Sequence, residues 1–456
     1  MKKYRLAIDI GASSGRHILE YMQDGKMVLE EIYRFPNGAK NTDGSLYWDV
    51  DSLFENIVAG LAKAKELGKI PETVGIDTWA VDYALLDKDD RRIGEVFSYR
   101  DGRTQESAEK AHELLPFVSL YEKTGIQFQP FNTVYQLYAD KLTGKIEGAE
   151  SMLMLPDYFN FLLTGIKRQE YTNATSTGMV NALTHTWDEE INQTLGLPQK
   201  LFGELTLPGS VVGKFSKEIE ERVGYCATVM LPATHDTASA VLAAPIEKGQ
   251  PYISSGTWSL LGIEQSKAHT DPKSMAVNYS NEGSLNYTFR YQKNIMGLWM
   301  IQQVRHELDD EYSFAELADM ARANPKDIFI DVNDNKFLSP ANMTAAIEEE
   351  TGKLSVGEMA YVIYSGLAKC YKKCIEELEE LTGEKYHTLY IIGGGSKNAL
   401  LNEMTAKETG LRVVTGPTEG TAIGNLIMQM IGSGEIKDLK EARGIVKKSF
   451  NIEEVE

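Results

Sequence analysis

The feature that most constrains the fold is a repeated pattern of strand, small-residue turn and strand. It occurs first where the apolar stretch Tyr4–Ile10 is followed by a turn at residues 11–15 and an extended stretch at residues 16–21. It occurs again over residues 252–262, with Ser254, Ser255 and Gly256 at the turn. Each copy predicts a β-hairpin whose turn is rich in glycine and hydroxyl groups. The repetition indicates duplicated domains.

Helices and further strands follow both hairpins. Leu53, Ile57 and Leu61 recur at helical spacing, and residues 74–83 then predict a strand. In the second half a helix over about 356–381 precedes a strand at 388–392, three glycines and another helix. This alternation is typical of α/β proteins. We therefore expect two α/β domains, residues 1–245 and 246–456, with the boundary near 245–250.

The composition excludes several classes of partner. The 456 residues include 47 Lys and Arg against 66 Asp and Glu, a net charge of −19, whose average field repels nucleic acids and anionic membranes. An anionic small ligand remains compatible, provided that the site supplies its own positive potential. No apolar run is long enough to span a bilayer. Three cysteines in a chain of this length indicate a reducing compartment, so we expect a cytoplasmic protein.

Two of the cysteines, Cys370 and Cys374, lie one helical turn apart. That spacing suits a metal ion, but no second pair of ligands accompanies them. We interpret both as structural residues of a helix.

The turns of the two hairpins have the chemistry of a phosphate site. Glycine at both ends of the first turn lets backbone N–H groups point inward, and the serines add donors. Asp9, at the end of the first strand, is placed to hold a hydrated Mg²⁺. The second turn, at residues 254–257, repeats the pattern. The alternative for each is an ordinary hairpin turn, with Asp9 as a capping residue.

The three glycines at residues 393–395 lie between a strand and a helix, where nucleotides dock in open α/β sheets. The chain contains neither G-x-G-x-x-G after a strand nor the G-x-x-x-x-G-K-[ST] loop, which disfavours a dinucleotide site and a P-loop. The alternative is a strand–helix turn without a ligand.

Asp236 follows an apolar stretch and precedes an alanine-rich helix. It is either a helix N-cap or a carboxylate that accepts a proton from an alcohol. Asp77 and Asp82, on either side of Trp79, lie in an apolar segment where unpaired carboxylates are costly. They are sugar-hydroxyl acceptors or structural hydrogen-bond partners.

Taken together, these motifs resemble the FGGY carbohydrate kinases of the actin/hexokinase/Hsp70 superfamily over nearly the whole chain. The segments that carry the resemblance occur in the family's order: ASSGR (12–16), GIDTW (75–79), FNTVYQL (131–137), PDYF (156–159), EYTNAT (170–175), HDTAS (235–239), SSGTWS (254–259) and KNIMGLW (293–299). Within the family, these segments are most similar to those of the enzymes that phosphorylate L-rhamnulose.

The resemblance implies two RNase-H-like domains around a cleft. It also implies transfer of the ATP γ-phosphate to the 1-hydroxyl of L-rhamnulose, with Mg²⁺. Asp236 is then the proton acceptor. His235, Thr237 and Asn294 belong to the sugar site, together with the backbone at Ala80. The remaining positions contact ATP: Ala12, Ser13, Ser14, Gly15, Arg16, Thr257, Gln302 and Gly394.

The sequence departs from the family pattern at Ala80, where glycine is usual, which leaves the exact ketose open between L-rhamnulose, L-fuculose and D-xylulose. A non-catalytic sugar or ATP sensor on the same fold and an Hsp70- or actin-like ATPase are the competing functions. The partners expected are small molecules, with neither nucleic acid nor membrane, in a monomer or homodimer.

Overall fold

The chain divides into two units that are not continuous in sequence. The structure is a computed structural model that describes residues 2–338 and 340–455. The first unit comprises Met1–Ala243, Gln265–Tyr291 and Thr421–Ser449. The second comprises Ala244–Glu264, Gln292–Gly420 and Phe450–Glu456. Among the described residues, no helix has the length and apolar character that crossing a membrane requires.

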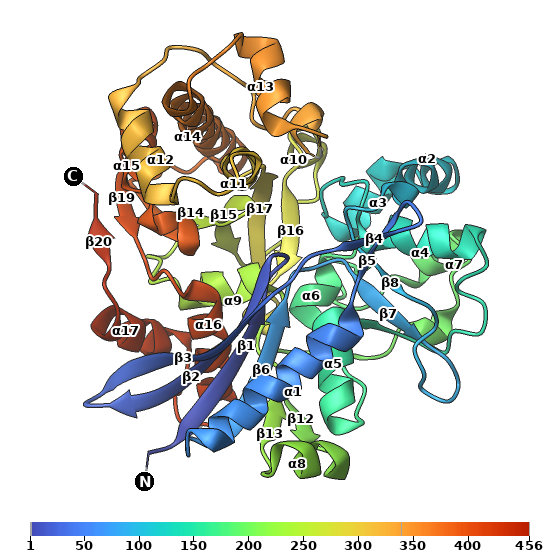
Figure 1. Cartoon of the computed structure of the whole chain (residues 1–456). Coiled ribbons are helices and arrows are strands. Elements are labelled where there is room, and N and C mark those ends of the chain that lie inside the picture. Colours follow the sequence, from blue (N-terminus) through green and yellow to red (C-terminus); the bar gives the residue numbers. More distant parts are fainter. Residues whose placement is uncertain (1, 339, 456) are drawn as a thin grey trace. The chain divides into compact units, whose positions relative to one another are not determined.

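The first unit is built on a six-stranded sheet (Figure 1). Its strands, in sheet order, are β12 (Val211–Lys214), β13 (Thr228–Met230), β6 (Pro71–Thr78), β1 (Tyr4–Ile10), β2 (Ser14–Gln23) and β3 (Lys26–Pro36). β1 pairs antiparallel with β2 and parallel with β6, and β6 pairs parallel with β13. Smaller strands are β4 (Lys40–Thr42), β5 (Ser45–Trp48), β7 (Tyr83–Leu86), β8 (Val96–Phe97), β9 (Ser151–Met154), β10 (Gln169–Glu170), β11 (Leu205–Thr206) and β16 (Ser280–Gly283).

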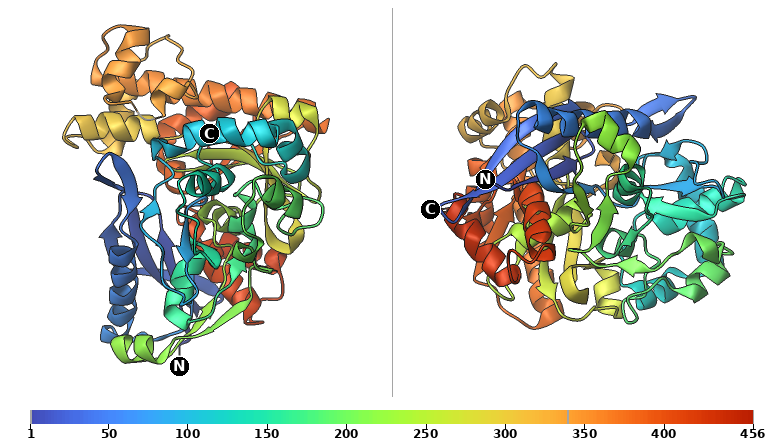
Figure 2. Two further views of the ribbon diagram at one scale, coloured as in Figure 1. Left: turned by 90° about the vertical axis from the view of Figure 1, so that its right-hand side faces the viewer. Right: turned by 90° about the horizontal axis from the view of Figure 1, so that it is seen from below.

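The helices of the first unit come from all three of its segments. They are α1 (Val50–Glu66), α2 (Gln105–Leu114), α3 (Phe117–Thr124), α4 (Thr133–Leu142), α5 (Leu155–Thr164), α6 (Tyr171–Thr175), α7 (Glu189–Thr194), α8 (Lys217–Val223), α9 (Asp236–Ala243), α10 (Pro272–Ala276), α16 (Gly420–Gly432) and α17 (Leu439–Ser449). α8 lies beside α1, as the left-hand view of Figure 2 shows, and the Tyr225 hydroxyl donates to the Leu61 carbonyl at 3.1 Å.

The two faces of the main sheet differ in chemistry. Leu6, Ile8 and Ile10 of β1 enter an apolar core with Leu53, Ile57 and Leu61 of α1 and residues of α5. Because side chains alternate along a strand, Asp9 and Asp77 lie on the opposite face. α16 covers that face, where its Asn425 donates to the Asp77 carboxylate at 2.6 Å. The strand ends on this polar face carry the candidate site.

The second unit repeats the arrangement of the first. In sheet order, its strands are β17 (Phe289–Ile295, of which Phe289–Tyr291 belong to the first unit), β15 (Ser259–Gln265), β14 (Tyr252–Ser255), β18 (Thr388–Ile392), β19 (Arg412–Thr415) and β20 (Glu453–Glu454). The hairpin β14–β15 corresponds to β1–β2, and the parallel strands β18 and β19 correspond to β6 and β13. Its helices are α11 (Trp299–Glu307), α12 (Phe314–Ala323), α13 (Met343–Thr351), α14 (Val356–Thr382) and α15 (Ala399–Thr409).

The division proposed from sequence, at residue 245, places residues 265–291 and 421–449 in the second domain. In the structure both segments pack with the first unit. The reason is visible on α16, where Gln429 donates to the Leu6 carbonyl at 3.0 Å and Asn425 to the Gly75 carbonyl at 3.1 Å. Such pairings across more than 300 residues leave no local pattern in the sequence.

Candidate active site

Asp236 is the first residue of α9, and the chain before it is tied to the main sheet. The Thr78 N–H, at the end of β6, donates to the Thr234 carbonyl at 2.9 Å, and Thr78 and His235 form a parallel bridge. The Asp236 side chain remains 31% exposed. The polar end of β6 and the start of α9 therefore lie next to each other.

A buried glutamate holds the loop that leads into Asp236. Glu170 is fully buried, and its Oε2 accepts hydrogen bonds from the Thr234 hydroxyl at 2.7 Å and the Thr172 hydroxyl at 2.6 Å. Its side chain also accepts from backbone N–H groups of α6. Glu170 thus joins α6 to the loop of Asp236. In the sequence, the only local indication of this role was an acidic residue directly before a helix start that contains threonine.

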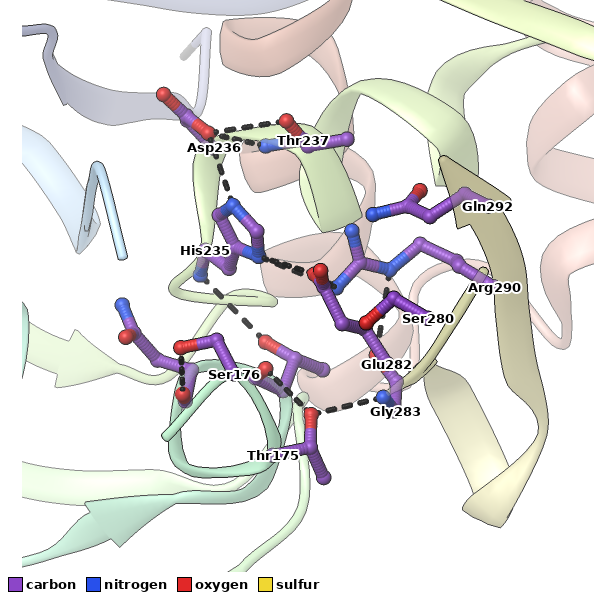
Figure 3. A network of polar contacts seen from close by, with 12 residues as sticks. Thr175, Ser176, His235, Asp236, Thr237, Ser280, Glu282, Gly283, Arg290 and Gln292 are labelled. Carbon is purple, nitrogen blue, oxygen red and sulfur yellow. Dashed lines mark hydrogen bonds and ion pairs between the residues drawn. The ribbon is translucent and has the colours of Figure 1, made fainter. Parts of the chain in front are cut away.

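The Asp236 carboxylate has one oxygen engaged and one available. Oδ1 accepts from the N–H of the next residue, Thr237, at 2.5 Å (Figure 3). An N-cap side chain instead accepts from an N–H two or three residues further along the chain. Among the residues that the structure describes, Oδ2 has no hydrogen-bond partner. Burial raises the pKa of Asp236, and the charge of Asp9 adds to the rise; the charge of His235 and the Thr237 hydrogen bonds oppose it. This arrangement suits a proton acceptor better than a cap.

Two further carboxylates lie on the same polar face. The Asp9 Oδ2 accepts from Arg16 NH2 at 2.7 Å, across the β1–β2 hairpin. Asp77 is fully buried; burial raises its pKa far above the usual value, and the charges of Asp9 and Asp236 raise it further. Its burial and the hydrogen bond from Asn425 favour the structural interpretation of Asp77.

The turn between β1 and β2 leaves backbone donors unused. The Gly11 N–H donates to the Ser14 carbonyl at 2.9 Å, which closes the turn. The N–H groups of Ala12 and Ser13 have no partner within the described part of the chain, and Ser13 is exposed. Gly15 is required by packing, because a Cβ there would lie 2.0 Å from the Phe35 ring. The turn can therefore accept an anion at its tip.

The segment after β6 contains a strained residue. Val81 has φ +69°, a conformation that a β-branched residue rarely adopts, and it follows the half-buried Ala80. Its carbonyl accepts from the Thr133 hydroxyl at 2.7 Å and from Gln136 at 3.2 Å. Two side chains of α4 thus fix the backbone beside Ala80.

Asp82 is the centre of a buried hydrogen-bond network. Its Oδ2 accepts from the indoles of Trp48 at 2.6 Å and Trp79 at 2.9 Å, and its Oδ1 accepts from Gln136 at 3.0 Å. Burial raises its pKa to about 6 despite these donors. These donors within the protein favour the structural interpretation of Asp82.

In the second unit, the β14–β15 turn carries Thr257. The Thr257 hydroxyl donates to the Gln302 side chain on α11 at 3.2 Å, so these two predicted residues are in contact. The Trp299 N–H donates to the Thr257 carbonyl at 3.1 Å. The Thr257 N–H has no partner among the described residues. Asn294 lies half-buried near the end of β17.

The triple-glycine turn lies against the same hairpin. A Cβ on Gly395 would lie 2.0 Å from the Ser255 hydroxyl, and one on Gly393 would lie 2.9 Å from the Ser255 carbonyl. Gly394 is different, because it is exposed and a Cβ there would meet nothing within 4 Å. Packing explains two of the glycines and leaves Gly394 as bare backbone open to a ligand. A hollow of about 540 Å³ borders this turn, lined by Ser396, Lys397, Asn402 and Thr415 among others.

The structure thus groups the predicted residues into two sets. Asp9, residues 12–16, Ala80, His235, Asp236 and Thr237 belong to the first unit; Thr257, Asn294, Gln302 and Gly394 belong to the second.

Cys370 and Cys374 lie on α14, where Cys374 is buried. Among the described residues, no group of three or more His, Cys, Asp or Glu side chains can hold a metal ion. Sequence reasoning gave no catalytic role to Glu170. It also missed Glu282, which contacts His235, and Arg290, which contacts Glu282.

Comparison with solved structures defines the class of the fold. A gluconate kinase from Lactobacillus acidophilus matches with a TM-score of 0.81 at 18% sequence identity, over 99% of this chain and 93% of that one. The expected architecture of two related α/β domains is therefore confirmed as that of the sugar kinases.

Sequence comparison then places the chain in a family. Residues 4–243 match the N-terminal domain, and residues 251–433 the C-terminal domain, of the FGGY family of carbohydrate kinases. The chain belongs to this family and is a carbohydrate kinase. It is 45% identical to a rhamnulokinase from Oceanobacillus iheyensis, over 99% of this chain and 98% of that protein. It is 46% identical to a rhamnulokinase from Halalkalibacterium halodurans, over 98% of each.

Proposed function

We propose that this protein transfers the γ-phosphate of ATP to the 1-hydroxyl of L-rhamnulose, giving L-rhamnulose 1-phosphate. The observation that carries the proposal is the identity of 45–46% to two rhamnulokinases over nearly the whole chain. The arrangement of Asp236, with one carboxylate oxygen fixed and the other available, supports the chemistry.

In the proposed reaction Asp236 accepts the proton of the C1 hydroxyl while that oxygen attacks the γ-phosphorus. The O–H bond breaks, a new O–P bond forms, and the bond from phosphorus to the ADP oxygen breaks in line with it. The Thr237 N–H holds Oδ1, which leaves Oδ2 to take the proton. Because phosphoryl transfer depends mainly on positioning and charge neutralisation, a carboxylate close to the hydroxyl is sufficient.

The remaining residues have proposed roles in binding. His235, Thr237, Asn294 and the backbone at Ala80 bind the sugar. The fixed backbone at Val81 leaves little freedom for Ala80 to move, so the extra methyl group is a determinant of which ketose fits.

For the nucleotide, the turn at residues 12–16 and Thr257 donate hydrogen bonds to the phosphates. Gln302 and Gly394 contact the nucleotide, with the base near Gly394. The open donors at Ala12, Ser13 and Thr257 support this assignment, because aligned N–H groups stabilise phosphate oxygens without basic side chains.

The residues of the polar face also fit a magnesium ion. The negative charge of Asp9 raises the pKa of both Asp77 and Asp236, so a cation held at Asp9 would relieve repulsion among the three carboxylates. Mg²⁺ is commonly held by one or two carboxylates together with phosphates and water, so the lack of a three-ligand cluster among those residues is compatible with it. Asp9 would hold the ion, which supplies charge neutralisation at the phosphate oxygens when bound.

A screen of ADP release against a panel of ketoses tests the proposed function. We expect L-rhamnulose to give the highest kcat/KM, above L-fuculose and D-xylulose, and ATP turnover to depend on added sugar. Sugar-independent turnover would indicate an ATPase instead. The absence of turnover with every ketose would indicate a sensor.

The exposed position of Gly394 gives a prediction about nucleotide binding. Gly394→Val is expected to raise KM for ATP about tenfold, a loss of ~1.4 kcal/mol, because its Cβ meets no protein atom and the side chain would occupy the space proposed for the nucleotide. The unfolding temperature should stay at the wild-type value. Gly395→Ala is the matched control, since its Cβ meets the Ser255 side chain and should lower stability. Unchanged KM for ATP in Gly394→Val would remove Gly394 from the nucleotide site.

A further inference from the structure

A buried ion pair lies behind His235, on the side away from Asp236 (Figure 3). Glu282, on β16, has its Oε2 3.1 Å from His235 Nδ1 and 3.0 Å from Arg290 NH2. The Arg290 side chain is 0% exposed and that of Glu282 is 6% exposed. Groups so fully removed from water interact strongly and have little freedom to change partners.

The chemistry of the three side chains determines which nitrogen of His235 carries hydrogen toward the pair. Arg290 NH2 also lies 3.2 Å from Nδ1, but a guanidinium group has only donors. An unprotonated Nδ1 would accept from Arg290, but its lone pair would then face the Glu282 carboxylate at 3.1 Å, so the geometry favours Nδ1–H donating to Glu282. This bond fixes the orientation of the imidazole ring.

The ring so oriented faces the proposed catalytic carboxylate. His235 Nε2 lies 3.4 Å from Asp236 Oδ1, slightly longer than a well-formed hydrogen bond. Positive charge on His235 lowers the pKa of Asp236, against the effects of burial and of Asp9. The position of the ring therefore influences both the geometry and the charge of the group that accepts the proton.

Glu282 itself is held from both sides along its strand. The Asn281 N–H donates to the Gly125 carbonyl at 2.8 Å, and the Gly283 N–H donates to the Thr175 hydroxyl at 2.8 Å. A Cβ on Gly283 would lie 2.5 Å from the Tyr171 ring, so the strand lies directly against α6. The same helix is joined to the loop of Asp236 through Glu170.

We propose that Glu282 and Arg290 are positioning residues of the phosphoryl transfer. Arg290 orients the Glu282 carboxylate, and Glu282 holds the His235 ring with Nε2 toward Asp236. The proposal rests on the proposed function, in which Asp236 accepts the proton of the sugar. Neither residue touches the reacting atoms, and each acts through His235.

A double-mutant cycle tests this coupling. Glu282→Gln keeps the size of the side chain and removes the charged acceptor, and we expect kcat with L-rhamnulose to fall about tenfold while KM for ATP is unchanged. His235→Gln places an amide near the position of Nε2 but has no equivalent of Nδ1–H. In that background, Glu282→Gln should have no further effect on kcat. Additive losses in the double variant would overturn the proposal.

Glu282→Gln leaves Arg290 as a buried charge, so a second variant separates positioning from stability. The variant that combines Glu282→Gln with Arg290→Met removes both charges. It is used in the cycle in place of Glu282→Gln if that single variant fails to fold. We expect this pair variant to fold and to lose about as much in kcat. Wild-type kcat in the folded pair variant would show that the ion pair serves stability alone and would overturn the proposal.

A spectroscopic measurement in the protein without ATP or sugar makes the two proposals distinguishable. In ¹⁵N-histidine NMR, with His235 assigned by its loss in His235→Gln, we expect Nδ1 to be protonated in the wild type and to change in the pair variant. An unprotonated Nδ1 in the wild type would overturn the role of Glu282. Undiminished kcat in Asp236→Asn would instead contradict the proposed function, and the NMR result would be unaffected.

Discussion

Replacing Asp236 by asparagine is expected to lower kcat for sugar phosphorylation by about 10²- to 10⁴-fold, because an amide cannot accept the proton of the hydroxyl. ATP affinity and the free energy of unfolding should stay close to wild type. The reason lies in the raised pKa of Asp236, which means that its charge costs stability in the folded state at pH values above that pKa. Removing the charge therefore costs little at neutral pH. ADP release, calorimetric ATP binding and thermal unfolding measure the three quantities.

The pH dependence of the wild type provides a second readout. Protonated Asp236 cannot act as a base, so kcat/KM should fall as the pH falls through its pKa. Because that pKa is raised, the acid limb should lie above the ordinary carboxyl value of 3.8. The residual activity of Asp236→Asn should lack this limb. As a control, Asp271→Asn changes the N-cap carboxylate of α10 and should keep kcat. If Asp236→Asn loses several kcal/mol of stability and retains its turnover per folded molecule, Asp236 is a helix cap.

A large effect on folding is expected at Gly424 of α16. A Cβ there would lie 1.8 Å from the carbonyl oxygen of Ser239 on α9, and backbone atoms cannot move away without displacing the helix. Gly424→Ala should therefore lower the free energy of unfolding by about 3 kcal/mol or more. Because α9 begins at Asp236, the remaining folded protein should also have a lower kcat. Chemical denaturation and ADP release per folded molecule measure the two effects.

Gly444 provides the matched control for this prediction. It also lies in a helix of the first unit, α17, but a Cβ there would meet nothing within 4 Å. Gly444→Ala should raise stability by about 0.5–1 kcal/mol through helix propensity alone. Equal stability of the two alanine variants would show that α9 and α16 do not pack as closely as described.

Local patterns in the sequence were sufficient for the elements that bury an apolar face near their own neighbours. The hairpin from Tyr4, the helix with Leu53 and Leu61, and the long helix α14 lie where periodicity predicted them. The membership of α16 and α17 in the first unit could not be predicted, because it depends on polar contacts such as Asn425 with Asp77. Such contacts have no periodicity and join residues at opposite ends of the chain.

The candidate site shows the same limit. The local pattern at Asp236 also fits an ordinary helix N-cap, and the glycine run at residues 393–395 also fits a turn without a ligand, so the proposed roles of Asp236 and Gly394 depend on the resemblance to the family. Glu282 was not identifiable, since a single glutamate in a strand has many ordinary explanations, and its partner His235 lies far away in sequence. The environment of Asp82 likewise became clear only when the indoles of Trp48 and Trp79 were seen to donate to it.

The return of the chain to its first unit has a consequence for its synthesis. During translation β1 and β6 emerge more than 300 residues before Asn425 and Gln429, which donate to their polar face. Arg5 likewise meets Glu435 at the far end of the chain. The first unit thus begins to emerge before the second, and its last segment follows most of the second. Until then the polar face of β1 and β6 lacks the hydrogen bonds that α16 supplies.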